Sequence, residues 1–268
     1  MDLSGSQPAY QTLRVDDADG VLTVTLQRPE ARNSINRVML QELHAVLDVV
    51  EAQQRHHLVV LQGQPGTFCT GMDFNEVATL KPDLPPEVRE GLTRPYMRLL
   101  RRMALMPQVV IAKVDGEVLA GGMGLVVASD LVVATPRSRF SLSEVLWGLL
   151  PAMVIPYLIR RVGYQHAYRM ALTTLPVTAE AGVGMCLVDE LSDTPDAAIR
   201  RLRTRLSRVR TSTVGNLKRY CRQMWLLTHE VEEAAVAEIS RLMFHPEFQG
   251  NLRDFVEHQV FPWESKDR

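Results

Sequence analysis

Short apolar runs of strand length alternate with longer amphipathic stretches, and this alternation restricts the chain to few folds. Residues 58–61, Val109–Val114 and Leu131–Ala134 are apolar runs of strand length, and the second has the near-continuous character of a strand buried on both faces. Apolar spacings of three and four residues predict a helix over 39–50 and a longer one over 87–106. Strands that alternate with helices in this way predict the α/β class.

The beginning of the chain has the pattern of a hairpin that leads into a helix. Val21–Leu26 follows Asp19 and Gly20 and is typical of the second strand of a hairpin that begins near Tyr10. Residues 34–36 can then cap the first helix.

The rest of the chain divides into an α/β part and a helical part. Residues 63–71 are rich in turn formers, residues 74–80 predict a short helix, and three prolines between 81 and 86 exclude regular structure there. Helical periodicity then dominates after residue 151, over 154–162, 165–173, 196–206, 214–227 and 231–243. We therefore expect a core over 1–195 and a helical region over 196–268.

Composition excludes several kinds of partner. The 268 residues are 46% apolar and can bury a substantial core. The 30 basic and 31 acidic residues form no long run of one sign, so we expect neither a nucleic acid nor a membrane as partner. Cys69, Cys186 and Cys221 fit no disulfide framework or metal spacing, and the first residues lack the pattern of an export signal. These features favour a cytoplasmic protein without a metal.

The first candidate for chemistry is the segment 68–74, which passes from a strand through a loop into a helix. Cys69 and Thr70 precede Gly71, which frees the backbone, and Asp73 can cap the helix that begins at Phe74. The exposed amides of such a loop would point at a ligand. A glycine near a strand end is, however, also a common turn and packing device.

The second candidate is the segment 120–124, another passage from a strand into a helix. Gly121, Gly122 and Gly124 would let a substrate approach peptide N–H groups at a positive helix terminus. Two such sites facing each other would form an oxyanion hole for an enolate. A dinucleotide site is excluded, because Val127 stands where a third glycine is needed.

Glu144 is the most informative acid, because apolar residues surround it in the sequence. Leu142, Val145, Leu146 and Trp147 predict a position removed from water, where a carboxyl pKa rises toward the working pH of a general acid/base. The alternative is a partly buried carboxylate that backbone amides or an arginine satisfy.

Taken together, these segments resemble the crotonase (enoyl-CoA hydratase/isomerase) superfamily. The resemblance rests on five stretches spread over nearly the whole chain, at 26–35, 68–73, 118–124, 140–144 and 163–174. It implies a crotonase-like spiral of ββα turns closed by trimerising C-terminal helices, in a homotrimer or hexamer. It also implies that the N–H groups of Met72 and Gly121 hold the enolate oxygen and that Glu144 is the second of two catalytic glutamates. The loop residues then line the path of a phosphopantetheine arm, at Cys69, Thr70, Asp73, Gly122 and Gly124.

The chain departs from the family at its first glutamate, whose position is Gly124 here. A hydratase that orients water with two carboxylates is thereby put in doubt, whereas one glutamate suffices for a 1,3-proton shift or a syn elimination. The segments 68–74, 140–151 and 261–264 resemble the dehydratases of polyketide β-branching cassettes. That resemblance implies conversion of 3-hydroxy-3-methylglutaryl-acyl carrier protein (ACP) to 3-methylglutaconyl-ACP, without a metal or redox cofactor.

Some assignments stay open at this point. A glutaryl substrate has a distal carboxylate that Lys81 or Arg94 could meet, although cations beside a loop are usually solvated. Trp147 is expected to shape the acyl pocket or the core. The thioester can be carried by ACP or by CoA. The alternatives to a dehydratase are a Δ3-Δ2 enoyl isomerase or decarboxylase of the same fold, and a non-catalytic acyl-thioester-binding homologue.

Overall fold

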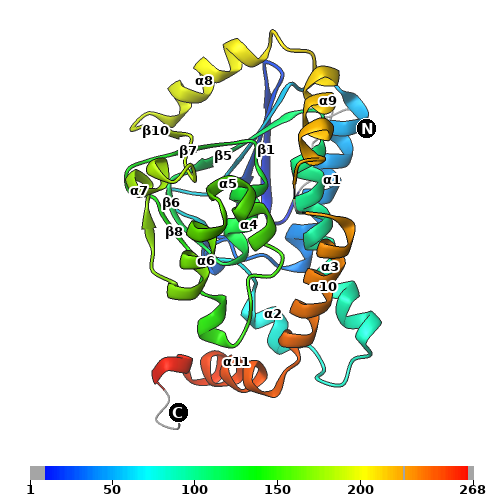
Figure 1. The fold of residues 1–268 in the computed structure, drawn as a ribbon, viewed down its shortest axis with the longest axis vertical. Helices are drawn as coiled ribbons and strands as arrows, with labels where there is room; N and C mark the ends of the chain where they lie inside the picture. Colours follow the sequence, from blue (N-terminus) through cyan, green and yellow to red (C-terminus); the bar gives the residue numbers. More distant parts are fainter. Residues whose placement is uncertain (1–9, 226, 265–268) are drawn as a thin grey trace.

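The protein folds around two β-sheets covered by helices, as a computed structural model shows for residues 10–225 and 227–264 (Figure 1). The six-stranded sheet has the order β1-β2-β3-β5-β7-β10, with strands Leu13–Ala18, Val21–Leu26, Leu58–Gln62, Val109–Val114, Leu131–Ala134 and Glu190–Leu191. The four-stranded sheet has the order β4-β6-β8-β9, with strands Gly66–Cys69, Gly116–Leu119, Arg139–Ser141 and Val177–Thr178. The first residues, on which the expectation about export rested, lie outside the described residues.

Successive turns of the chain add one strand to each sheet. β3 is followed by β4, β5 by β6, and β7 by β8, and the first member of each pair joins the larger sheet while the second joins the smaller one. Neighbouring strands in both sheets are parallel, except for the antiparallel pairs β1–β2 and β8–β9. This repetition is the expected spiral of ββα turns, and the α/β class is confirmed.

Eleven α-helices and three short 3₁₀ helices lie within the described residues. The α-helices are α1 (Arg37–Gln53), α2 (Phe74–Ala78), α3 (Pro86–Leu105), α4 (Gly121–Ala128), α5 (Ile155–Val162), α6 (Tyr164–Thr173), α7 (Ala179–Gly184), α8 (Pro195–Leu206), α9 (Thr211–Arg222), α10 (His229–Met243) and α11 (Pro246–His258). The 3₁₀ helices are η1 (Pro29–Ala31), η2 (Glu144–Trp147) and η3 (Pro262–Glu264). No helix of residues 10–225 and 227–264 is both long and apolar enough to cross a bilayer.

The opening hairpin and first helix form where the sequence predicts them. Asp19 and Gly20 both have positive φ, of 54° and 77°, which suits a tight turn between two twisted strands. Asn36 caps α1 by accepting a hydrogen bond from the Met39 amide.

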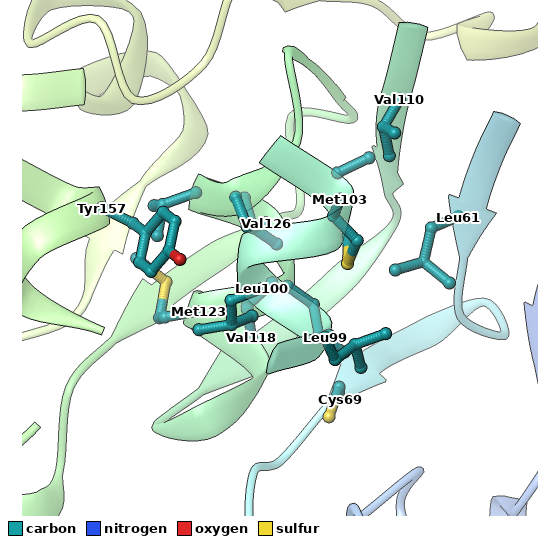
Figure 2. Packing of buried hydrophobic residues seen from close by; sticks show 14 of the residues in the cluster. Leu61, Cys69, Leu99, Leu100, Met103, Val110, Val118, Met123, Val126 and Tyr157 are labelled. Carbon is teal, nitrogen blue, oxygen red and sulfur yellow. The ribbon is translucent and has the colours of Figure 1, made fainter. Parts of the chain in front are cut away.

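The main core lies between the helices and the larger sheet. α4 is apolar on all sides and almost entirely buried, as expected of a helix in the middle of a domain. Figure 2 shows the side chains of Leu100 and Met103 from α3 among those of Val118, Met123 and Val126. This packing fixes the first turn of α4 relative to α3.

The last helices cover the core from one end to the other. α10 lies along α3, where the hydroxyls of Thr93 and Ser240 are 2.7 Å apart (Figure 1). α11 packs against α2 and η2 at the end of the molecule opposite α8. The C-terminal helices therefore contact the loops that carry the candidate residues.

Several short elements differ from the sequence expectation. The stretch 63–71, expected as a loop, contains β4, because Gly66 and Thr67 pair with Gly116 and Glu117 of β6. The helix expected over 214–227 begins earlier and ends at Arg222, and residue 226 lies outside the described part of the chain. Elements that the sequence did not predict are β6, β8, β9, β10, α7 and α11.

Candidate active site

Met72, Gly121 and Glu144 each follow a strand of the smaller sheet and lie at the same edge of it. β4, β6 and β8 are parallel neighbours, with Cys69 paired to Val118. Each candidate lies two or three residues beyond the carboxyl end of its strand. Because parallel strands end at one edge, the fold brings together three positions that are far apart in the sequence.

The Met72 amide is turned outward by a single β-bridge with Ile35. The Ile35 amide donates to the Gly71 carbonyl at 2.6 Å, and the Asp73 amide donates to the Ile35 carbonyl at 3.0 Å. In a trans peptide the N–H points opposite the preceding C=O, so the Met72 N–H points away from Ile35. No acceptor for this N–H lies among the described residues.

A buried polar clamp holds the loop that carries Met72. The Asn33 side chain donates to the carbonyls of Thr67 and Phe68, at 3.2 and 3.1 Å, and accepts from the Arg28 amide at 2.8 Å. The Arg28 guanidinium binds Asp73 Oδ2 at 2.8 Å. Arg28 and Asn33 belong to the stretch 26–35, the first of the five stretches that carry the family resemblance. Their contacts show that this stretch fixes the Met72 loop.

Asp73 is engaged on both oxygens and is not free for a substrate. Its Oδ1 caps α2 by accepting from the amides of Asn75 and Glu76, at 3.1 and 3.3 Å, while Oδ2 holds Arg28. The expected cap is present. The expected contact of its side chain with substrate is not supported by this arrangement.

The Gly121 amide opens toward the same edge from the start of α4. The Ala120 carbonyl accepts from the Met123 amide at 2.9 Å, so the Gly121 N–H on the same peptide points away from the helix. It is one of the first N–H groups of α4 and has no acceptor among the described residues. Ala120 has φ 47° and ψ −122°, a strained conformation for a residue with a side chain.

The two loops touch each other through Gly71. A Cβ atom on Gly71 would lie 2.9 Å from the Gly121 nitrogen and 2.9 Å from the Ala120 side chain. A Cβ atom on Gly121 would lie 3.5 Å from the Gly71 α-carbon. The amides of Met72 and Gly121 therefore lie on adjoining backbone, as two donors to one oxygen require.

Glu144 begins η2 and is buried, with 9% of its surface exposed. Burial raises the pKa of its carboxyl to about 7, and the nearby backbone of Ser143 and Glu144 partly offsets the rise. Its Oε2 has no hydrogen-bond partner among the described residues. Of the two alternatives, the carboxylate satisfied by amides applies only in part, because the backbone of Ser143 and Glu144 stabilises the carboxylate while Oε2 has no partner among the described residues.

Trp147 lies at the other end of η2, in an aromatic cluster at the C-terminus. Its ring centroid is 4.7 Å from that of Phe74 and 5.1 Å from that of Phe255. Phe261 and Trp263 of the last turn both lie 6.1 Å from it. Met72 packs against the same apolar cluster. The cluster therefore connects the Met72 loop with α2, η2 and the last described residues.

Gly122, Gly124 and Cys69 have packing tasks. A Cβ atom on Gly122 would overlap the Cys69 carbonyl, and one on Gly124 would overlap the Tyr96 hydroxyl and lie 3.0 Å from Tyr96 Cζ. Burial raises the pKa of the Cys69 thiol to about 12, so it stays protonated. These residues allow close contact between α4 and its neighbours, and their expected contacts with substrate stay predictions.

The remaining candidates lie at the margin of the site. Thr70 is half-buried and donates to the Arg32 carbonyl at 3.2 Å. Lys81 is exposed. Arg94 pairs with Glu90 at 2.7 Å and Glu233 at 2.5 Å, so a substrate carboxylate would have to displace them.

Sequence reasoning did not find Tyr96, whose hydroxyl donates to the Gly121 carbonyl. It lies on the apolar side of α3, where its spacing is that of a core residue. Nothing in the spacing from Gly124 indicates that the two meet.

Two open hollows lie away from these residues. One, of about 370 Å³, is lined by residues such as Asp130, Arg160 and Lys218, and the other, of about 310 Å³, by residues of α6 and α7. Neither is lined by Met72, Gly121 or Glu144. Neither hollow is therefore the candidate site.

This arrangement can stabilise an oxyanion and move a proton. Two outward amides meet at the end of a helix, and a carboxyl that titrates near neutral pH lies at the same edge. That combination suits removal of a proton next to a thioester carbonyl.

Comparison with known proteins gives likenesses that extend over nearly the whole chain. A family model described as enoyl-CoA hydratase/isomerase matches residues 16–266. The bacillaene synthase dehydratase PksH of Bacillus subtilis is 34% identical over 265 residues, covering 96% of this chain and 98% of that protein. A crystal structure described as a Bacillus subtilis polyketide biosynthesis enoyl-CoA hydratase, PksH, has a TM-score of 0.85 at 32% identity, covering 95% and 100% of the two chains. An enoyl-CoA hydratase from Mycobacterium avium has a TM-score of 0.79 at 27% identity, covering 94% and 99%.

Proposed function

This chain belongs to the enoyl-CoA hydratase/isomerase (crotonase) family, and on that premise we propose that it dehydrates an acyl thioester in polyketide biosynthesis. It is a hydro-lyase of the enoyl-CoA hydratase type. The expected fold and family are both confirmed. The reaction argued below is the one that this chain's own residues support best.

The observation that carries the proposal is the solitary Glu144 carboxyl beside two outward amides. Its Oε2 is buried without a partner among the described residues, and its pKa of about 7 gives both protonation states near neutral pH. Position 124 is a glycine, and Tyr96 fills the space next to it, so no second carboxylate stands there. One group must therefore take the proton and assist the leaving hydroxyl.

The proposed reaction is a syn elimination. The ionised Glu144 takes the C2 proton, and the electron pair of the C2–H bond moves into an enolate whose oxygen the Met72 and Gly121 amides hold. The C2=C3 double bond then forms as the C3–O bond breaks, and the proton on Glu144 goes to the departing hydroxyl to give water. The carboxylate is regenerated. One such amide donor contributes roughly 3 to 4 kcal/mol to stabilisation of the oxyanion.

We propose 3-hydroxy-3-methylglutaryl-ACP as substrate and 3-methylglutaconyl-ACP as product. The likeness to the bacillaene synthase dehydratase over nearly the full length supports this choice. Lys81 is exposed and stays the candidate for the distal carboxylate, since Arg94 already has two acidic partners. The phosphopantetheine arm would enter between the Met72 and Gly121 loops, and no further cofactor is needed.

The protein is proposed to work in the cytoplasm as a homotrimer or a dimer of trimers. Its three cysteines are free, which suits a reducing compartment. Two helices also present exposed apolar faces that another subunit could cover, through Tyr164, Tyr168 and Leu172 on α6 and Leu217 and Tyr220 on α9, with Met224 just after it.

A Δ3-Δ2 enoyl isomerase or a decarboxylase of the same fold is the second candidate function. The single carboxylate favours it, because a 1,3-proton shift also needs one group that gives and takes a proton. Product mass separates the possibilities, since dehydration loses water, decarboxylation loses carbon dioxide and isomerisation loses nothing.

The test is to incubate the purified protein with 3-hydroxy-3-methylglutaryl-ACP and, separately, with the CoA thioester. Mass spectrometry of the acyl group should show loss of water, and faster with the carrier protein. An unchanged acyl mass together with an unchanged acyl structure by NMR, with both substrates and in the presence of bound ligand, would identify a non-catalytic homologue. Faster conversion of the CoA thioester would reject the carrier-protein assignment.

A further inference from the structure

Tyr96 of α3 and Gly124 of α4 interlock beneath the proposed oxyanion hole. A Cβ atom at position 124 would overlap the Tyr96 hydroxyl. Tyr96 is buried, with 7% of its surface exposed, and its ring lies in the main core beside Leu100 and Met97. The glycine at 124 is therefore what allows a tyrosine to reach this place.

The Tyr96 hydroxyl donates to the carbonyl of Gly121, the residue whose amide is proposed to hold the substrate oxygen. This bond ties the first turn of α4 to α3. Ala120, immediately before it, has a strained backbone at φ 47°, so the turn needs an external contact to keep its shape. A Cβ atom built on Gly121 would lie 3.6 Å from Tyr96 Oη, so the hydroxyl is in van der Waals contact with this residue.

Tyr96 remains a neutral donor over the working pH range. Burial raises the pKa of its phenol well above the usual value, and the negative charge of Glu144 raises it further. The effect of Glu144 also places its carboxyl within electrostatic reach of the tyrosine. Tyr96 thus contacts the Gly121 carbonyl directly and lies within electrostatic reach of Glu144.

We propose that Tyr96 is a positioning residue that fixes the Gly121 amide for catalysis and occupies the space that a side chain at position 124 would need. The inference rests on the proposed function, because it assigns a task to the Gly121 amide. It goes beyond it by naming the side chain that maintains the single-carboxylate site. Gly124 is then required for Tyr96, and Tyr96 for the orientation of Gly121.

Tyr157 provides a matched control, because it is a second buried tyrosine in the same core. Its hydroxyl contacts Met97 Sδ at 4.0 Å and it is 1% exposed. Tyr96→Phe and Tyr157→Phe remove the same atom from the same cluster. If the two variants have similar thermal stability but different kcat, the difference arises from where the Tyr96 hydroxyl lies. It does not arise from loss of a buried hydroxyl as such.

The first measurement is steady-state turnover of 3-hydroxy-3-methylglutaryl-ACP. Loss of a direct oxyanion donor costs about 100- to 1000-fold, so loss of a bond that orients a donor should lower kcat by about ten-fold in Tyr96→Phe, with KM nearly unchanged. Tyr157→Phe should keep its kcat within about two-fold. Gly124→Ala should lower kcat at least as much as Tyr96→Phe, because the new methyl group displaces the hydroxyl. The double variant Tyr96→Phe/Gly124→Ala should be no slower than Gly124→Ala, since the overlapping oxygen is gone.

The second measurement reads the amide directly and does not need turnover. In a Glu144→Gln background, infrared spectroscopy follows the isotope-labelled carbonyl of bound 3-hydroxy-3-methylglutaryl-CoA. Its stretching frequency should fall on binding, and the fall should be smaller with Tyr96→Phe but not with Tyr157→Phe.

The two measurements separate failure of the inference from failure of the proposed reaction. Equal kcat and equal carbonyl shift with and without the Tyr96 hydroxyl would overturn the positioning role even if water is lost. A Tyr96-dependent carbonyl shift without loss of water would uphold the positioning role and reject dehydration. Strictly additive losses in the double variant would also overturn the proposed interlock.

Discussion

The α-carbon of Gly71 faces the amide nitrogen of Gly121 so closely that a methyl group on Gly71 would lie 2.9 Å from that nitrogen. Gly71 also has φ +87°, a conformation that disfavours a side chain. The separation of the two proposed donors, Met72 and Gly121, therefore depends on a missing side chain at position 71.

Gly71→Ala should abolish most of the activity by pushing the two loops apart. Loss of one aligned donor is expected to lower kcat about 100-fold. Steady-state kinetics with the carrier-bound substrate measures this change. A kcat within two-fold of the wild type would show that the spacing of the loops does not matter.

Gly66→Ala is the matched control for that variant. Gly66 has φ +94° but faces open space, so alanine there meets the same backbone strain, about 1 to 2 kcal/mol, without obstructing the site. Gly66→Ala should lose stability in thermal unfolding through this strain alone, and Gly71→Ala should lose at least as much, because its methyl group also meets the facing loop. Only Gly71→Ala should lose activity beyond what the folded fraction explains.

Glu144→Gln should keep thioester binding and lower turnover at least about 100-fold, because the amide has the same size but cannot transfer a proton. Isothermal titration with the CoA thioester tests whether binding is kept, and a rate assay tests whether turnover falls. The control is Glu238→Gln on α10, which removes a surface carboxylate paired with Arg241. Unchanged turnover in Glu144→Gln would reject the acid/base role.

The rate should rise with pH on a single limb centred near pH 7. Dehydration begins from the ionised Glu144, whose pKa burial raises to about 7, so kcat/KM is lost as the pH falls below that value. Hydration of the product should show the same limb, because the elimination regenerates the carboxylate. A pH profile of both directions measures this. A bell-shaped profile would indicate a second essential acid.

Stability should fall as the same group ionises. The pKa of Glu144 is higher in the folded protein than in the unfolded chain, so the stabilisation from the protonated carboxyl is present at low pH and is lost as the pH rises through about 7. From pH 5 to 8.5, Glu144→Gln should gain about 2 to 3 kcal/mol in unfolding free energy relative to the wild type. Urea unfolding at both pH values measures the gain. A difference independent of pH would contradict a raised pKa.

Periodicity in the sequence predicts the long elements of this fold and misses the short ones. Val109–Val114 and α3 have enough apolar residues for their pattern to decide the assignment. β4 and β8 have four and three residues, too few for a period, and β4 begins at a glycine. Their strand conformation comes from pairing with β6, which is a tertiary contact.

The candidate site shows the same division between local and distant information. The motif around Gly71 and the apolar neighbours of Glu144 are local features, and the sequence locates both. The contact of Tyr96 with Gly124 depends on how α3 crosses α4, which no local spacing encodes. Likewise, Asp73 is visible in the sequence as a helix cap, but its second partner, Arg28, is apparent only in three dimensions.

The aromatic cluster around Trp147 forms late during synthesis of the protein, because it needs residues far along the chain. Phe255, Phe261 and Trp263, which cover η2, are among the last residues of the described chain to leave the ribosome. Until they arrive, Trp147 of η2 lacks these three aromatic neighbours. A nascent chain can thus pair the strands of both sheets before Phe255, Phe261 and Trp263 cover η2.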